Sequence, residues 1–220
     1  MVGVRTLEQE HCVVEILISG GPVMIPLGLL SLVAVAIIIE RLWVLRRGNF
    51  LQGSTVETLS GLLASDKFQG AVDFCRRHPG PFTDLVTALI ENRYAPYEEL
   101  KEILEDTGRL QLTGLQRGLP ALATIVAGAP LLGLLGTVIG MIKIFSVVAT
   151  SGSGITEQLS SGISQALITT ATGLVIAIPA LFTHSYLESR ALSILSDIEA
   201  QILDFLHLVR EHERSNEESD

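Results

Sequence analysis

Three long stretches of this chain contain no Asp, Glu, Lys or Arg, and they constrain its fold more than any other feature. They are residues 22–39, 118–142 and 158–187. A helix needs about 20 mostly apolar residues to cross the roughly 30 Å hydrocarbon core of a bilayer. With 48% hydrophobic residues and a mean hydropathy of +0.46, the chain of 220 residues is also too apolar for an ordinary soluble domain. We therefore expect an all-α membrane protein with three transmembrane helices.

Basic residues near the ends of these spans predict their orientation. Cytoplasmic flanks of membrane helices carry an excess of Lys and Arg. Arg47 follows the first span, Arg117 precedes the second and Arg190 follows the third. The opposite side has only Arg5, and residues 149–157 contain no Lys or Arg. We expect the N-terminus outside and the C-terminus in the cytoplasm.

The long segment between the first two spans has helical periodicity. Residues 55–64, 68–77 and 82–92 each place apolar side chains at helical spacing, and Pro and Gly residues separate these segments. We therefore expect a small cytoplasmic helical bundle within residues 48–117.

Two further apolar patterns predict helices that extend from the membrane. From Pro96 the pattern runs toward the second span with Gly108, Gly114 and Gly118 as its only weak points and no further proline until Pro120, which predicts one long helix. Beyond the third span, apolar residues recur every three or four positions from Leu192 to Val209. That helix should continue the third span and pack on its neighbour.

Charge and cysteine content exclude several functions. The net charge of -9 arises mainly in residues 188–220, which hold nine acidic and three basic residues, and this argues against nucleic acid as a partner.

Cys12 and Cys75 fall on opposite sides of the membrane and cannot pair within one chain. The spacing of Cys75 and His78 resembles half a metal site without a second half, so we expect a buried or idle thiol. We predict no metal, no cofactor and no catalytic residues, because no nucleophile, base and carboxylate set occurs at a plausible spacing.

Small and polar residues form stripes on the second and third spans, on a helical wheel of about 100° per residue. One sector of the second span holds Ala129, Gly133, Gly136, Thr137 and Gly140, with Lys143 at its edge. One sector of the third span holds Gly162, Ala166, Thr170, Gly173 and Ala177, and a second polar stripe holds Gln165, Thr169 and Thr172. We expect close helix packing at Gly133, Gly136, Gly140, Gly162 and Gly173.

Two interpretations of the polar residues are open at this stage. Threonine hydroxyls can bond to the carbonyl four residues back, so the stripes can be purely structural. They can also line an ion pathway. Lys143, near the outer end of its span, can either extend its ammonium group to the interface or contact a polar pore or partner. Glu40 and Arg41, at the inner end of the first span, are interpreted as an interfacial anchor.

Two segments carry a family resemblance. Residues 128–142 (GAPLLGLLGTVIGMI) and 162–180 (GISQALITTATGLVIAIPA) resemble the signature segments of the MotA/TolQ/ExbB proton channel family, most closely its ExbB and TolQ branch. The three-span plan with a large first cytoplasmic loop agrees with that branch. The MotA branch, with an extra span and a larger loop, fits poorly.

The resemblance implies a location in the bacterial inner membrane and a division of the chain into seven segments. These are a periplasmic N-terminal segment (1–21), transmembrane helix 1 (22–44), a cytoplasmic helical loop (45–117), transmembrane helix 2 (118–148), a periplasmic connector (149–158), transmembrane helix 3 (159–187), and a cytoplasmic C-terminal helix with an acidic tail (188–220).

The resemblance also implies partners and site residues. Five chains would form a ring around the single spans of two ExbD-like or TolR-like subunits, and proton flow would energise a TonB-like or TolA-like periplasmic effector. Thr137 and Thr170 match threonines that face the pore in this family, and Gln165, Thr169 and Lys143 complete the expected ion pathway. Relatives usually carry Glu where this chain has Gln165. Because an amide cannot titrate, the proton carrier must then be an aspartate of the partner.

Some alternatives stay open at the level of sequence. The Gln165 difference leaves sodium coupling possible beside proton coupling. A membrane ring that conducts nothing and organises other proteins through its cytoplasmic helices is the rival function. The sequence does not indicate whether the effector serves nutrient uptake, envelope maintenance or motility, nor which role the loop and the acidic tail have.

Overall fold

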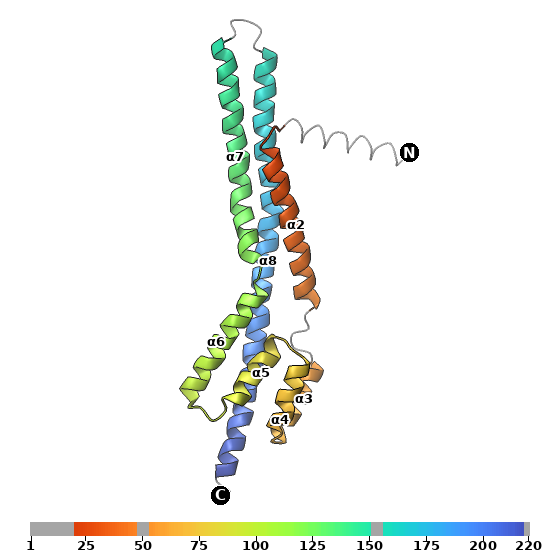
Figure 1. Cartoon of the computed structure of the whole chain (residues 1–220), viewed down its shortest axis with the longest axis vertical. Coiled ribbons are helices and arrows are strands. Elements are labelled where there is room, and N and C mark those ends of the chain that lie inside the picture. Colours follow the sequence, from red (N-terminus) through yellow and green to blue (C-terminus); the bar gives the residue numbers. More distant parts are fainter. Residues whose placement is uncertain (1–19, 48–52, 151–155, 218–220) are drawn as a thin grey trace, which may run out of the picture. The chain divides into compact units, whose positions relative to one another are not determined.

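The computed structural model describes residues 20–47, 53–150 and 156–217, and all regular secondary structure in those ranges is helical (Figure 1). Cys12, most of the predicted segment 1–21 and half of the predicted segment 149–158 lie outside the described residues. The predicted all-α class is confirmed for the described part of the chain. Its helices are α2 (Met24–Arg47), α3 (Gly53–Ala64), α4 (Phe68–Arg77), α5 (Pro81–Glu91), α6 (Tyr97–Leu115), α7 (Leu119–Thr150) and α8 (Thr156–Glu217).

Three of these helices are long and apolar enough to cross a membrane, as predicted. The candidate spans are Met24–Leu45 in α2, Leu119–Ser146 in α7 and a part of Ser160–Arg210 in α8, with mean hydropathies of 2.1, 2.2 and 1.9. Many of their large apolar side chains are exposed, for example Val175 at 70% and Phe182 at 71%. Such surfaces require hydrocarbon or another protein chain around them.

The first compact unit combines the described parts of residues 1–41 and 118–186. It contains most of α2, all of α7 and the first half of α8, which lie side by side (Figure 1). Its core is small and apolar, so the three helices are held by close packing. The buried residues of that core are Val23, Met24, Leu27, Ala129 and Ala177, with Leu132, Ile139 and Ile176 packed against them.

The second compact unit combines the described parts of residues 42–117 and 187–220. The three predicted loop segments are the helices α3, α4 and α5, within two residues at each end. The C-terminal half of α8 packs against them, and the Phe82 and Phe205 rings lie 5.7 Å apart in this core. Arg210 on α8 donates a hydrogen bond to the Ala95 carbonyl oxygen at 2.7 Å. The expected helical bundle is therefore present.

Local sequence explains where the bundle helices begin. Pro81 is the first residue of α5, where its missing N–H leaves no hydrogen bond unmade, and Asp84 lies in the first turn. Pro96 precedes α6, whose first turn carries Glu98 and Glu99. Acidic side chains in the first turn interact favourably with the positive end of the helix dipole.

The prediction of one long helix from Pro96 into the second span is wrong. α6 ends at Leu115 and α7 begins at Leu119, with a break between them. Gly118 has a φ of 83°, a left-handed conformation that glycine adopts at little cost and that interrupts a right-handed helix. Pro120 would also clash with the carbonyl group of Gln116 if the helix were continuous.

The helix of the third span does continue beyond it. α8 is a single helix over Thr156–Glu217, although it contains Pro179, and it contributes to both units. The apolar positions predicted from sequence, such as Ile198, Ile202 and Val209, are buried on its C-terminal half.

Candidate functional site

Helices α7 and α8 approach each other so closely that side chains are excluded from part of their contact. A Cβ on Gly133 would lie 2.9 Å from the Thr169 carbonyl oxygen and 3.0 Å from the Thr170 Cα. A Cβ on Gly140 would lie 3.1 Å from the Ala166 Cβ. All three distances are tighter than ordinary packing, so the backbone of α8 and the small Ala166 side chain occupy the space that a larger side chain would need.

The glycines of α8 show the same exclusion from the other side. A Cβ on Gly173 would lie 2.6 Å from the Ala129 carbonyl oxygen, and one on Gly162 would lie 2.5 Å from Ile144 Cγ1. Small residues at regular spacing are what allow membrane helices to pack in this way. All five glycines named from the sequence therefore lie in the α7–α8 contact of one chain. The fifth is Gly136, which faces the side chain of Thr169.

One hydrogen bond crosses this contact. The Thr170 hydroxyl on α8 donates to the Gly133 carbonyl oxygen on α7 at 3.1 Å. The bond needs the close approach of the two backbones, because a threonine side chain is short. A hydroxyl has one proton to donate and two lone pairs that accept. With its proton on Gly133, Thr170 can still accept a hydrogen bond from another group.

The other threonines donate within their own helices. Thr169 is 0% exposed and donates to the Ala166 carbonyl oxygen at 2.8 Å. Thr172 donates to Ile168 at 2.8 Å, and Thr137 donates to Leu134 at 2.7 Å. This is the structural interpretation that the sequence had left open for these hydroxyls. For Thr169, complete burial favours packing, and its place on an ion pathway stays a prediction.

Gln165 on α8 lies against Gly21, three residues before the start of α2. Gly21 has a φ of 71°, and a Cβ at this position would overlap the Gln165 side-chain amide. The amide is half-buried, and no hydrogen bond to it occurs within the part of the chain that the structure describes. An amide that both donates and accepts is therefore available to a ligand or partner group beside the α2 start.

Lys143 stands apart from the polar cluster of α8, which consists of Gln165, Thr169 and Thr170. It is exposed near the C-terminal end of α7, next to the buried Ile144. The structure thus brings Gln165, Thr169 and Thr170 together on one part of α8, with Thr137 on the facing helix and Lys143 farther along α7. Both interpretations of Lys143 remain open.

Two features were missed or underestimated at the level of sequence. The contact of Gly21 with Gln165 was not predicted, although the pair Gly20 and Gly21 before Pro22 is a recognisable break signal. Arg41 was interpreted as an interfacial anchor, but it is only 5% exposed and forms an ion pair with Glu40 at 3.1 Å. No sequence pattern distinguishes a buried arginine at a span end from an exposed one.

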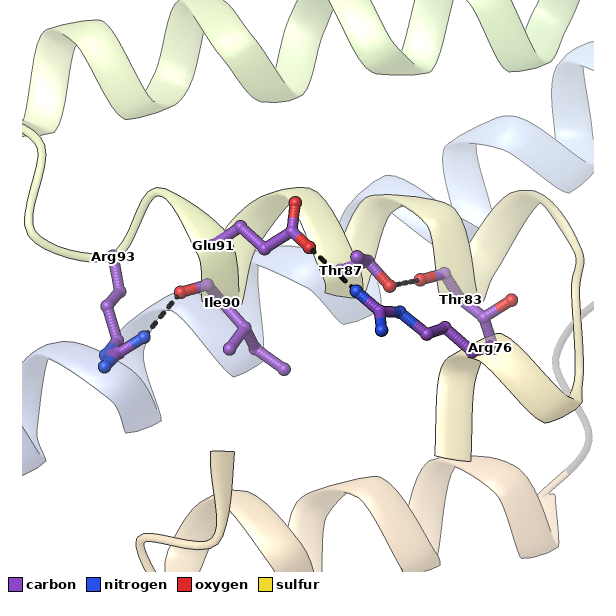
Figure 2. Close-up of polar contacts among 6 residues, drawn as sticks. All are labelled: Arg76, Thr83, Thr87, Ile90, Glu91 and Arg93. Carbon is purple, nitrogen blue, oxygen red and sulfur yellow. Dashed lines mark hydrogen bonds and ion pairs between the residues drawn. The ribbon is translucent and has the colours of Figure 1, made fainter. Parts of the chain in front are cut away.

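The second unit contains polar contacts that have a structural role (Figure 2). Arg76 on α4 lies 4.0 Å from the Glu91 carboxylate on α5, and Arg93 donates to the Ile90 carbonyl oxygen at 2.9 Å. Thr87 donates to Thr83 within α5 at 2.8 Å. The Arg76–Glu91 pair joins α4 to α5, and the other two contacts lie within α5 and at its C-terminal end.

Cys75 on α4 is buried, as expected for a structural thiol. Burial raises the pKa of the Cys75 thiol, and the nearby Asp84 carboxylate adds to the rise against an opposing hydrogen bond with Thr87. A raised pKa disfavours the thiolate that nucleophilic or metal-binding chemistry would need.

The comparisons with known proteins agree on one family. A model of the MotA/TolQ/ExbB proton channel family matches residues 80–200, more than half of the chain. Two relatives from Synechocystis sp., named biopolymer transport protein ExbB-like 1 and ExbB-like 3, are 34% and 33% identical. Those alignments cover 83% and 79% of this chain, and 73% and 86% of the relatives. The Tol-Pal system protein TolQ of Pseudomonas aeruginosa is 26% identical over 83% of this chain and 86% of its own.

The matched region contains α7 and the membrane-spanning part of α8, and therefore the whole close contact described above. The three apolar helices and these matches together identify a multi-pass membrane protein that belongs to the MotA/TolQ/ExbB proton channel family.

Proposed function

We propose that this protein is the large subunit of an ExbB/TolQ-type motor driven by the proton motive force across the bacterial inner membrane. Five copies would form a ring around two single-span subunits of the ExbD/TolR type. The ring would convert ion flow into work on a TonB-like or TolA-like periplasmic effector. The family is one of channels and transport proteins, so we propose no enzymatic activity.

The observation that carries this proposal is a polar cluster without a carboxylate inside an apolar helix pair. Residues 118–142 and 158–187 contain no Asp or Glu, yet Thr170 lies in the α7–α8 contact and Gln165 lies five residues earlier on α8, against Gly21. A proton carried on a carboxylate through this region needs that carboxylate from another chain. An aspartate on the partner's span is the group that we propose.

The geometry suggests that Thr170 and Gln165 interact with different protonation states of the partner's aspartate. The Thr170 proton is engaged with Gly133, so its oxygen would accept a hydrogen bond from a protonated aspartic acid. The Gln165 amide can donate, so it would stabilise the ionised carboxylate. One residue thus favours the neutral carrier and the other favours the charged carrier. Such a pair lowers the difference in free energy between the two protonation states inside the membrane.

Proton flux into liposomes tests the proposal. The ring alone should leak little, and reconstitution with the single-span subunit should produce a flux that depends on the potential. Changing the partner's intramembrane Asp to Asn should abolish that flux. A parallel assay with sodium replacing the proton gradient separates the two coupling ions. Equal flux with and without the partner's aspartate would overturn the proposal, and absence of any flux in an assembled complex would favour the passive scaffold.

A further inference from the structure

Arg41 is a buried cation whose hydrogen-bonding capacity is only partly used. Its side chain is 7% exposed, and its Nη2 atom lies 3.1 Å from Glu40 Oε1, the only ion pair it forms among the described residues. The Nε atom is buried and has no hydrogen-bond partner in the described part of the chain. Buried polar groups are almost always paired, so an unpaired N–H on a cation indicates a missing partner.

The unpaired atom lies beside the N-terminus of α7. A Cβ on Gly118 would be 3.6 Å from Arg41 Nε. The Gly118 carbonyl oxygen accepts the first bond of the helix, from Leu122 N at 3.1 Å. The N–H groups of Leu119 and Ala121 precede that bond and have no partner inside a helix. Gly118 has no side chain that could cap them.

The Arg41 guanidinium and the N-terminus of α7 both carry positive charge. The N-terminus of a helix carries a positive partial charge, and α7 is 32 residues long. The Arg41 guanidinium adds a full positive charge against it. Glu40 offsets part of this charge, but its side chain is 61% exposed and so is not buried beside the guanidinium. An anion at this point would pair with the guanidinium and accept hydrogen bonds from the free N–H groups.

The position in the chain indicates which anion is available. Arg41 lies four residues before the end of the candidate span Met24–Leu45, and Gly118 immediately precedes the candidate span Leu119–Ser146. Both therefore lie at the depth where one span leaves the membrane and the next one enters it. Phosphate groups of lipid headgroups are concentrated at that depth.

We propose that Arg41 and the N-terminus of α7 form a binding site for an anionic phosphate group, supplied by an acidic phospholipid. The site is independent of the proposed motor function, since none of its groups belongs to the polar cluster of α8. The phosphate would accept from Arg41 Nε and from the first N–H groups of α7. Occupation would hold the end of α2 against the start of α7.

Trp43 provides a local probe, because it is the only tryptophan in the chain and lies two residues from Arg41. The full-length protein is reconstituted in vesicles of brominated phosphatidylcholine, whose bromine atoms quench tryptophan fluorescence. Unbrominated phosphatidylglycerol or phosphatidylcholine is then titrated in, and the recovery of fluorescence gives the relative binding of the two lipids. We expect phosphatidylglycerol to bind about fivefold more tightly, the scale of one basic group at an anionic surface.

Three variants test the assignment to Arg41. Arg41→Gln should remove the preference, whereas Arg190→Gln, which changes an exposed arginine, should keep it. Glu40→Gln removes the carboxylate that competes for Arg41 from an exposed position, so it should raise the preference for phosphatidylglycerol. This variant tests the proposal even if Arg41→Gln does not fold. No preference in the wild type, or an unchanged preference in both Arg41→Gln and Glu40→Gln, would overturn the proposal.

A separate titration distinguishes the source of the phosphate. Inorganic phosphate is added to the protein in phosphatidylcholine vesicles while the Trp43 emission is recorded. We expect no change that depends on Arg41. A change that is present in the wild type and absent in Arg41→Gln would overturn the lipid assignment in favour of a soluble anion.

Discussion

The Thr170 hydroxyl on α8 donates a hydrogen bond to the Gly133 carbonyl oxygen on α7 at 3.1 Å, where a Cβ on Gly133 would lie only 3.0 Å from the Thr170 Cα. The same two residues thus set the distance between the helices and form a hydrogen bond across it. Any substitution at Thr170 changes the helix contact as well as the hydroxyl that we propose for the ion pathway. The variants must separate these two effects.

Thr170→Val keeps the shape of the side chain and removes the hydroxyl. We expect the helix pair to lose about 0.6 kcal/mol, the average for hydrogen bonds between membrane helices, and at most about 1.7 kcal/mol. Partner-dependent proton flux should fall several-fold, while the complex still assembles. Thr172→Val is the matched control, because the Thr172 hydroxyl bonds within its own helix. Thr170→Ser should restore both stability and flux. Equal flux from the Thr170→Val and Thr172→Val proteins would contradict the proposed role.

Gly133→Leu places a side chain where the backbone of α8 lies, 2.9 Å from the position of its Cβ. Overpacking of this kind typically costs about 1 to 3 kcal/mol and displaces the backbone. We expect a lower thermal midpoint in detergent and a weakened oligomer by native mass spectrometry. Gly128→Leu on the same helix is the control, because no atom lies within 4 Å of its added Cβ. If both variants melt like the wild type, the contact is not close-packed in solution.

The sequence predicted the helices and the small-residue stripes because both depend on local periodicity. Apolar spacing gave α3, α4 and α5, and the wheel placed Gly133 and Thr170 on separate stripes; that these two residues meet is a finding of the structure. It could not show which threonine bonds across the contact, because that depends on the separation of the backbones. The contact of Gly21 with Gln165 could not be predicted from local periodicity either, since it joins positions far apart in the chain. The break at Gly118 was missed because helical periodicity continues on both sides of it.

Topology rests on the basic flanks and can be tested by labelling. In a variant that lacks Cys12 and Cys75, new cysteines are introduced as Ser65→Cys in the loop and Ser189→Cys on α8, both at exposed positions. A maleimide that does not cross membranes should label neither in intact cells and both after permeabilisation, because arginine-rich flanks remain in the cytoplasm. Labelling of Ser189→Cys from outside would reverse the proposed orientation.

The Cys75 thiol predicts a pH dependence of stability. Burial raises its pKa in the folded chain, with a further rise from Asp84, so the unfolded chain loses the proton first as the pH increases. The unfolded state then binds fewer protons than the folded state, and the free energy of unfolding falls with rising pH. Below the ordinary cysteine pKa both states keep the proton and the effect vanishes.

We therefore compare Cys75 with Cys75→Ala, both in a Cys12→Ser background, because Cys12 also titrates. Thermal unfolding is followed by circular dichroism between about pH 7 and 10, the range around the ordinary cysteine pKa. The protein with Cys75 should lose stability more steeply on the alkaline side. Parallel pH curves would show that Cys75 is not shielded from water in the folded protein.

Gly21 and Gln165 should act as one unit, because the glycine leaves the space that the amide occupies. Gly21→Ala adds a Cβ that overlaps the amide and also strains a φ of 71°, so it should displace Gln165. If Gln165 donates to the partner's ionised carboxylate, both Gly21→Ala and Gln165→Ala should lower partner-dependent flux. Gln165→Glu should be tolerated better, because the family resemblance implies Glu at this position. The double variant Gly21→Ala with Gln165→Ala should be little worse than Gln165→Ala alone, since residues in contact are not additive. Additive losses in this cycle would mean that Gly21 acts through the start of α2 and not through Gln165.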